Sequence, residues 1–197
     1  MTAIVDYGAG NTKSVMNALD RLEAEYILTS NYDKIQNADR LILPGVGHAK
    51  AAMEQLKSRN LINVLIEYKK PFLGICLGMQ LMFEHSEEGN TECLGLIPDR
   101  IRKFNLLSGF KVPHMGWNDF APDVNCNLFS GLPENIPVYF VHSYYAEITE
   151  YSMGICDYIQ TFCAAITCKN FFGLQFHPEK SGVFGEQIMK NFINLKN

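Results

Sequence analysis

Apolar residues along this chain form short continuous runs that alternate with stretches of helical spacing. The continuous runs predict buried strands at residues 3–6, 26–28, 40–43 and 71–75. The helical spacing predicts helices at residues 14–22, 49–56 and 79–85. Strands that alternate with helices in this way build a mostly parallel central sheet with helices on both faces, so the first half predicts an α/β fold.

The second half of the chain has more strand and turn character. Further strands are predicted at residues 101–104, 110–112, 138–142, 162–168 and 172–176, and a closing helix at residues 185–195. Consecutive strands without helices between them favour an antiparallel, strand-rich part. Because no repeat, linker or low-complexity tract interrupts the sequence, residues 1–197 are predicted to form a single domain.

Composition narrows the class of protein. The 197 residues are 47% hydrophobic and 19% charged, as in a globular domain with a substantial core. The formal net charge is -4 and no run of Lys or Arg could follow a phosphate backbone, so nucleic acid is not a predicted partner. No signal-peptide pattern and no apolar run of membrane-spanning length is found, which predicts a cytoplasmic protein that does not enter the membrane.

The six cysteines are predicted to be reduced thiols, because a chain of this size without an export signal needs no disulfides. The closest pair, Cys163 and Cys168, lacks the second pair or the histidines of a zinc site, so no metal site is predicted. Lys13 stands where a dinucleotide-binding fingerprint starting at Gly8 needs its third glycine. No cofactor is therefore predicted.

Cys76 is the strongest candidate for a catalytic residue. It lies between a predicted strand and a predicted helix, in a Gly-Ile-Cys-Leu-Gly segment with the small-x-nucleophile-x-small pattern of a nucleophile elbow. The glycines permit a sharp turn, and the N-terminus of the following helix is expected to favour the thiolate form. The alternative for any cysteine is a small buried apolar residue, and we assign that role to the other five.

His177 and Glu179 are the candidate proton carrier and the group that orients it. A thiolate that attacks an amide needs a proton carrier, because the departing nitrogen must be protonated, and imidazole suits that transfer near neutral pH. His177 ends a predicted strand and is followed by Pro178 and Glu179. Because residues i and i+2 of an extended chain face the same side, we expect the Glu179 carboxylate to contact the His177 ring. The other histidines, at positions 48, 85, 114 and 142, are predicted to be structural or to contact substrate.

The Pro-Gly-Val-Gly segment at residues 44–47 follows another predicted strand and should lie at the same edge of the sheet as Cys76. Its glycines would let backbone N–H groups approach a negatively charged oxygen, as a tetrahedral intermediate of acyl transfer requires. A plain strand-to-helix turn is the alternative interpretation of this segment.

Three motifs together resemble those of the class-I, triad-type glutamine amidotransferases. They are Gly-Ile-Cys-Leu-Gly-Met-Gln at 74–80, Pro-Gly-Val-Gly at 44–47 and Phe-His-Pro-Glu-Lys-Ser at 176–181. Within that class, residues 6–11, 114–118 and 139–144 are similar to segments of the glutaminase subunits of imidazole glycerol phosphate synthases. The likeness spans nearly the whole chain and implies the flavodoxin-like fold of the class.

The resemblance implies a glutaminase of histidine biosynthesis that forms a thioester on Cys76 and passes ammonia to a (β/α)8-barrel synthase partner in a heterodimer. It implies that glutamine is held by Gly47, Gln80, Glu88, Ser143 and Tyr144. It implies an oxyanion site at Val46, Gly47 and Leu77. It also implies a partner interface at Asn11, Trp117, Tyr139 and Lys180, where core packing of Trp117 and an ordinary surface role for Lys180 are the alternatives.

Other interpretations remain open at this level. Thr12-Lys13, Asp99 and Tyr145 depart from the pattern typical of these subunits, so a paralogous subunit that supplies ammonia for amidation of surface sugars is an alternative. A binding or regulatory protein without turnover is a further alternative, although the intact set of Cys76, His177 and Glu179 argues against it. A stand-alone cysteine hydrolase such as a peptidase would be active without a partner.

Overall fold

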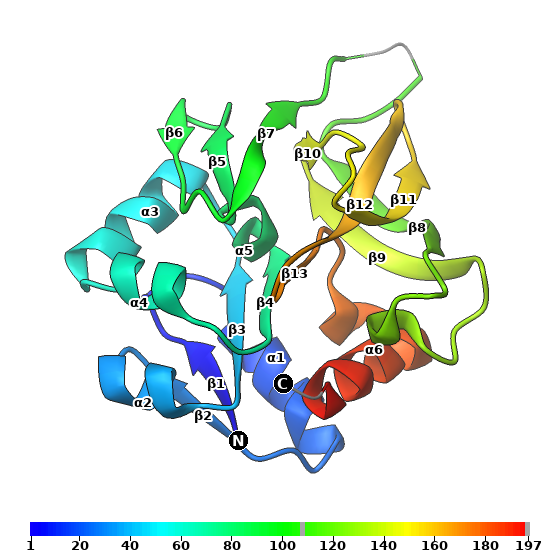
Figure 1. Cartoon of the computed structure of the whole chain (residues 1–197). Helices are drawn as coiled ribbons and strands as arrows, with labels where there is room; N and C mark the ends of the chain where they lie inside the picture. The colour runs from blue at the N-terminus through cyan, green and yellow to red at the C-terminus, as the bar shows by residue number, and fades with distance from the viewer. Residues whose placement is uncertain (107–108, 196–197) are drawn as a thin grey trace.

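The computed structural model describes residues 1–106 and 109–195. Its centre is a sheet whose first five neighbouring strands all run parallel (Figure 1). In spatial order these strands are β2 (Tyr26–Thr29), β1 (Thr2–Val5), β3 (Arg40–Gly45), β4 (Phe72–Cys76) and β13 (Phe171–Leu174). Strands β1 and β4 are buried along their whole length, as expected for parallel strands covered on both faces.

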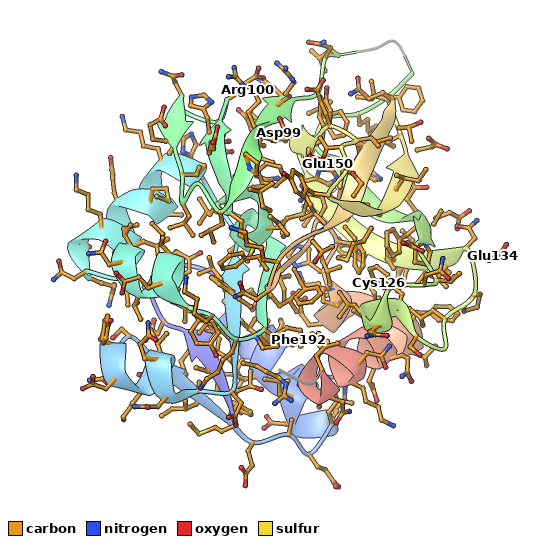
Figure 2. All side chains as sticks on the ribbon, in the orientation of Figure 1. Asp99, Arg100, Cys126, Glu134, Glu150 and Phe192 are labelled. Atoms are coloured by element: carbon orange, nitrogen blue, oxygen red, sulfur yellow. The ribbon has the colours of Figure 1, made fainter. Side chains whose placement is uncertain are left out.

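Helices cover both faces of the parallel strands. One face packs against α2 (Tyr32–Asn37), α3 (Ala49–Ser58) and α4 (Ile62–Glu67), and the other against α1 (Thr12–Arg21) and α6 (Gly182–Asn194). Side chains alternate between the two faces along each strand, so Ala3 and Val5 of β1 join the first cluster and Ile4 joins the second. Phe192 of α6 is buried in the second cluster (Figure 2).

The sheet continues into a largely antiparallel part built from the second half of the chain. Its strands are β5 (Phe83–Ser86), β6 (Thr91–Glu92), β7 (Ile97–Lys103), β8 (His114–Pro122), β9 (Ile136–His142), β10 (Tyr144–Ala146), β11 (Ser152–Asp157) and β12 (Thr161–Cys168). Strand β12 pairs antiparallel with β13 and so joins this part to the parallel strands, while β8 and β9 form an antiparallel pair beside it. The predicted α/β fold, with helices on both faces and a strand-rich second half, is confirmed.

The predicted helix at residues 79–85 is wrong in length and place. Helix α5 (Leu77–Gln80) is only one turn long, and the chain then enters strand β5. Residues 79–83 are buried and mostly apolar, and an apolar run of this length does not distinguish a helix from a strand. The predicted strand at residues 110–112 is also wrong, since the strand in this region is β8, which starts at His114.

Several elements have no counterpart in the sequence-based expectations. They are α2, α4, β5, β6, β8, β10, β11 and the 3₁₀ helices η1 (Asn127–Phe129) and η2 (Pro178–Lys180). Most are short, and a segment of two to six residues carries too few positions for periodicity to register. Strand β8 is long and its burial alternates, but the exposed positions include Met115 and Trp117 and the inward ones Gly116 and Asn118, so apolar and polar residues do not alternate in its sequence.

Within residues 1–106 and 109–195, no helix is both long enough and apolar enough to cross a bilayer.

The turn between β4 and α5 depends on glycines that let three backbones approach closely. A Cβ atom on Gly78 would collide with the carbonyl oxygen of Leu43 in β3, and one on Gly74 would lie 2.6 Å from the carbonyl oxygen of Gly78. Backbone atoms cannot move aside as the end of a side chain can, so these positions exclude any larger residue.

We predict that Gly78→Ala destabilises the protein by more than about 3 kcal/mol, because the methyl group must displace β3 from α5. The matched control is Gly95→Ala. Gly95 has a φ of +67° but open space around a Cβ atom, so only the conformational penalty of about 1 kcal/mol applies. Urea unfolding of both variants measures the difference, and equal losses would contradict the packing argument.

Candidate active site

Cys76 occupies the last position of β4, immediately before α5, in a strained backbone conformation. Its φ is +53° and its ψ is -111°, a combination that L residues rarely adopt. Gly74 and Gly78, two residues to either side, have no room for side chains, as the small-x-nucleophile-x-small pattern predicted. The thiol is 6% exposed, so it is buried apart from the side that lines a cavity.

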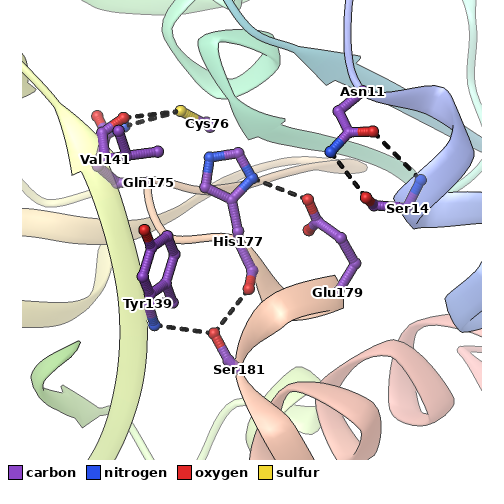
Figure 3. A network of polar contacts seen from close by, with 9 residues as sticks. All are labelled: Asn11, Ser14, Cys76, Tyr139, Val141, Gln175, His177, Glu179 and Ser181. Carbon is purple, nitrogen blue, oxygen red and sulfur yellow. Dashed lines mark hydrogen bonds and ion pairs between the residues drawn. The ribbon is translucent and has the colours of Figure 1, made fainter. Parts of the chain in front are cut away.

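Two polar groups lie against the sulfur of Cys76. The carbonyl oxygen of Val141 in β9 is 3.7 Å from Sγ, and the side-chain Nε2 of Gln175 is 3.8 Å from it (Figure 3). The carbonyl can only accept a hydrogen bond, so it pairs with the thiol, whereas the amide N–H can donate to the thiolate. Helix α5 contributes a single turn, so the helix dipole expected to favour the thiolate is small.

The predicted contact between His177 and Glu179 is present. The Nδ1 atom of His177 lies 2.8 Å from Oε1 of Glu179, and both side chains are almost fully buried, at 2% and 1% exposure (Figure 3). The expected reason for the contact was wrong. Glu179 lies in the 3₁₀ helix η2 and not in extended chain, so the turn of the backbone, rather than strand alternation, brings the carboxylate to the ring.

The His177–Glu179 pair shifts the protonation of the imidazole. Burial disfavours the charged ring, but the nearby Cys76 sulfur and the Glu179 carboxylate outweigh burial and raise the pKa of His177 from its ordinary 6.5 to about 10. With Nδ1 bound to Glu179, the Nε2 atom is the ring nitrogen available to a reacting group. That Nε2 is buried and makes no hydrogen bond within the described part of the chain.

Ser181 ties this pair to β9. Its Oγ donates to the carbonyl oxygen of His177 at 2.6 Å and accepts from the backbone N–H of Tyr139 at 3.0 Å. The backbone N–H of His177 in turn donates to the carbonyl oxygen of Tyr139 at 2.9 Å. The backbone around His177 is therefore fixed relative to β9 by hydrogen bonds on both sides of the residue.

One cavity of about 260 Å³ brings most of the predicted site residues together. It is lined by Cys76 and His177, by the predicted oxyanion residues Val46, Gly47 and Leu77, and by the predicted glutamine contacts Gln80, Glu88, Ser143 and Tyr144. Its size suits a ligand smaller than a typical drug molecule. The roles of these residues stay predictions, and the structure shows that they share this cavity.

The loop after β3 lines the cavity, and few other atoms pack against it. Gly47 has a φ of +98° and open space where a Cβ atom would lie, and Val46 is 40% exposed. The Oε2 atom of Glu88 accepts a hydrogen bond from the backbone N–H of Ala49 at 2.6 Å, so this carboxylate holds the start of α3 beside the loop. The sequence therefore correctly placed residues 44–47 at the same sheet edge as Cys76.

His114 and His142 form a buried pair beside the cavity, and their proton positions follow from their partners. The Nδ1 atom of His142 lies 2.8 Å from the carbonyl oxygen of Tyr144, so Nδ1 carries the proton and Nε2 accepts from Nδ1–H of His114 at 3.0 Å. The Nε2 of His114 then accepts from Asn118 at 3.3 Å. Burial lowers the pKa of His142 to about 3 and that of His114 to about 4, so both rings are neutral.

The four residues predicted at a partner interface lie outside the cavity. Trp117 of β8 is 58% exposed and meets the ring of Tyr139 edge to face, with centroids 6.1 Å apart. Lys180 places its Nζ 5.8 Å from the centre of the Tyr139 ring. Asn11 caps α1 through Ser14 (Figure 3). Core packing of Trp117, the alternative from composition, is excluded by its exposure.

Three residues of the site were missed by sequence reasoning. Gln175 and Val141 contact the sulfur, and Ser181 fixes the backbone of His177. Gln175 could have been found, since a polar residue in an otherwise apolar strand pattern two positions before His177 is itself a signal. Val141 contributes only its carbonyl group, which leaves no trace in the sequence.

No group of three or more His, Cys, Asp or Glu side chains in the described residues is arranged to hold a metal ion. All six cysteines are free thiols. Tyr145, one of the positions that departs from the resembled pattern, is buried and stacks on Phe104 with centroids 4.5 Å apart, so it packs in the core.

A nucleophilic cysteine on a strained strand-to-helix turn, beside a carboxylate-oriented imidazole, is the arrangement of a cysteine-dependent acyl-transfer enzyme. The chain belongs to the class-I glutamine amidotransferases, whose family model matches residues 3–195. It is 46% identical to the imidazole glycerol phosphate synthase subunit HisH of Bacteroides fragilis, over 98% of both chains. It is 49% identical to the protein of the same name from Bacillus cereus, over 98% of this chain and 93% of that one.

Solved structures show the same fold at low sequence identity. A structure of PurLQS from Thermotoga maritima superposes with a TM-score of 0.72 at 21% identity, over 98% of this chain and 97% of that one. A glutamine amidotransferase superposes with a TM-score of 0.74 at 14% identity, over 96% of both chains.

We predict that Glu179→Gln lowers the pKa of His177 and changes how stability depends on pH. The folded-state pKa is raised, so the protonated ring contributes stability fully below pH 6.5, and this contribution is lost as pH rises through about 10. The variant should therefore lose less stability than the wild type between these two pH values. Urea unfolding at several pH values measures the slopes.

The control for this experiment is Glu186→Gln, which changes a carboxylate that is 43% exposed and pairs with Arg21. It should keep the wild-type slope because exposed ion pairs contribute little. A Glu179→Gln slope identical to that of the wild type would show that the carboxylate does not control the protonation of His177.

Proposed function

We propose that this chain is the glutaminase subunit of an imidazole glycerol phosphate synthase in histidine biosynthesis, acting in the cytoplasm with a (β/α)8-barrel synthase partner. The observation that carries the proposal is the cavity shared by Cys76, His177 and the glutamine-contact residues in a member of the class-I glutamine amidotransferase family. The names of the curated relatives, at 44–49% identity, favour histidine biosynthesis over the amidation of surface sugars.

The proposed reaction begins when the Cys76 thiolate attacks the side-chain carbonyl carbon of glutamine. The carbonyl oxygen takes up the negative charge, which backbone N–H groups of Leu77 and residues 46–47 would stabilise. The imidazolium of His177 gives a proton from Nε2 to the amide nitrogen, and the C–N bond breaks to release ammonia and leave a thioester.

Hydrolysis of the thioester completes the cycle. His177, now neutral, removes a proton from a water molecule that attacks the thioester carbon, and glutamate leaves as the thiolate is restored. Glu179 holds Nδ1 of His177 throughout, so the same ring nitrogen acts as acid in the first half and as base in the second.

Exposed apolar side chains near the cavity support the proposal that a partner binds there and receives ammonia. Strands β8 and β9 place Met115, Trp117 and Tyr139 on one outward face, with Val183 close by at the start of α6, and we call these four residues the β8–β9 surface. Met115 is 63% exposed and Val183 76% exposed. The same strand β9 presents the Val141 carbonyl group to Cys76, so one strand carries both a contact to the nucleophile and part of this surface.

We predict that Cys76→Ala abolishes glutamine hydrolysis in the complex, whereas Cys168→Ala retains it. Purified together with its barrel partner, the wild type should hydrolyse glutamine faster when an imidazole-precursor nucleotide occupies the synthase. Release of glutamate with and without that nucleotide is the measurement. Full activity of the isolated chain, or no stimulation in the complex, would count against the assignment to this synthase.

We predict that Trp117→Ala weakens binding of the partner by about 30-fold or more, since an exposed tryptophan at the centre of an interface contributes about 2 kcal/mol or more. The matched control is Tyr32→Ala, which removes a 48% exposed aromatic side chain from α2. Calorimetric titration with the synthase gives both dissociation constants. If the two variants bind equally well, the β8–β9 surface is not the interface.

A further inference from the structure

Gln175 is the one fully buried amide that touches the nucleophile in the part of the chain that the structure describes. Its side chain has no exposed surface, and its Nε2 lies 3.8 Å from Sγ of Cys76. It follows β13 and stands two residues before His177, on the segment that positions the imidazole. Neither the proposed mechanism nor the sequence motifs assign it a role in the chemistry.

The orientation of the Gln175 amide follows from its neighbours. The carbonyl oxygen of Tyr144 can only accept, so the Gln80 atom 3.0 Å from it must be the NH₂ group. The same NH₂ group lies 2.9 Å from the Gln175 side chain, which must therefore present its oxygen to Gln80. The NH₂ group of Gln175 is then the end that faces the sulfur.

The Tyr144 carbonyl oxygen, at the start of this series of hydrogen bonds, also accepts a second hydrogen bond. His142 donates to it from Nδ1, and His142 is in turn fixed by His114. Reversal of the Gln175 amide alone would turn two NH₂ groups toward each other between Gln80 and Gln175. Reversal of Gln80 as well would place its oxygen against the carbonyl oxygen of Tyr144. Two buried donors, or two buried acceptors, that face one another make no hydrogen bond and cost free energy, so the donating orientation is locked.

The Val141 carbonyl group and helix α5 do little to stabilise a thiolate, which makes the Gln175 N–H an important donor to the sulfur. The Val141 carbonyl dipole points its negative end at Sγ from 3.7 Å and disfavours a thiolate, and α5 supplies only one turn of helix dipole. We propose that Gln175 stabilises the Cys76 thiolate by hydrogen bonding, and that Gln80 acts as a positioning residue that holds the Gln175 amide in the donating orientation. This inference rests on the proposed function only in taking Cys76 as the nucleophile.

The test follows the pH dependence of alkylation of Cys76 by iodoacetamide in the full chain. Peptide mass spectrometry reports on this cysteine separately from the five other free thiols. Gln175→Met keeps the shape but removes the donor, and a hydrogen bond to a charged group shifts a titration by about one pH unit. The midpoint should therefore rise by about one unit in Gln175→Met.

Gln175→Glu provides a second variant that keeps an acceptor for Gln80. Its carboxylate would face the sulfur, so the alkylation midpoint should rise at least as far as in Gln175→Met. If Gln175→Met loses its cooperative unfolding transition, the result for Gln175→Glu decides the question. The control is Gln160→Met, an exposed position in the turn between β11 and β12, which should keep the wild-type midpoint.

Wild-type midpoints in both Gln175 variants would overturn the proposal. The measurement needs no glutamine, no partner and no turnover. If the wild-type complex failed to hydrolyse glutamine, the proposed function would be wrong. The comparison of alkylation midpoints between wild type and Gln175 variants would still be valid, so the two failures are distinguishable.

Discussion

The close approach of β3, β4 and α5 is the constraint on which the site depends. Gly74 and Gly78 let these backbones meet without side chains between them, and the turn that results places Cys76 at a φ of +53°. Such a conformation is unfavourable in isolation and persists because the buried strands on both sides fix it. The strain is useful, because it projects the sulfur out of the sheet edge and into the cavity beside His177.

Burial shapes the chemistry of the site in two opposite ways. It disfavours the charged form of His177, and the paired groups must outweigh that cost for the site to hold a proton on the ring. The same burial makes each remaining hydrogen bond stronger than it would be in water. Glu179 acts on His177 and Gln175 lies against the sulfur, so each member of the reacting pair has a buried polar neighbour of its own.

Strand β9 connects the site to the outer surface. Its Val141 carbonyl group meets the sulfur, and two residues earlier Tyr139 packs with Trp117 and Lys180. Ser181 joins the backbone of Tyr139 to that of His177. A displacement of β9 would therefore change the surroundings of both reacting groups at once, which is a physical route by which a partner bound at this surface could affect the cavity.

The sequence by itself determined the features that depend on local chain chemistry. Alternating apolar runs and helical patterns predicted the parallel strands and the helices α1, α3 and α6, and the paired glycines around Cys76 predicted the turn that the structure contains. The proximity of His177 to Glu179 was also predictable, since only one residue separates them. These features share a cause, which is that each is set by residues close together in the chain.

Only the tertiary structure decided which distant groups meet. The contacts of Gln175 and Val141 with Cys76 join residues 99 and 65 positions apart. The paired neutral histidines, the one-turn length of α5 and the 3₁₀ turn that carries Glu179 likewise result from packing and hydrogen bonds between segments that the sequence does not place side by side. Long-range contacts of this kind depend on how the whole sheet is assembled, and no periodicity in one segment encodes them.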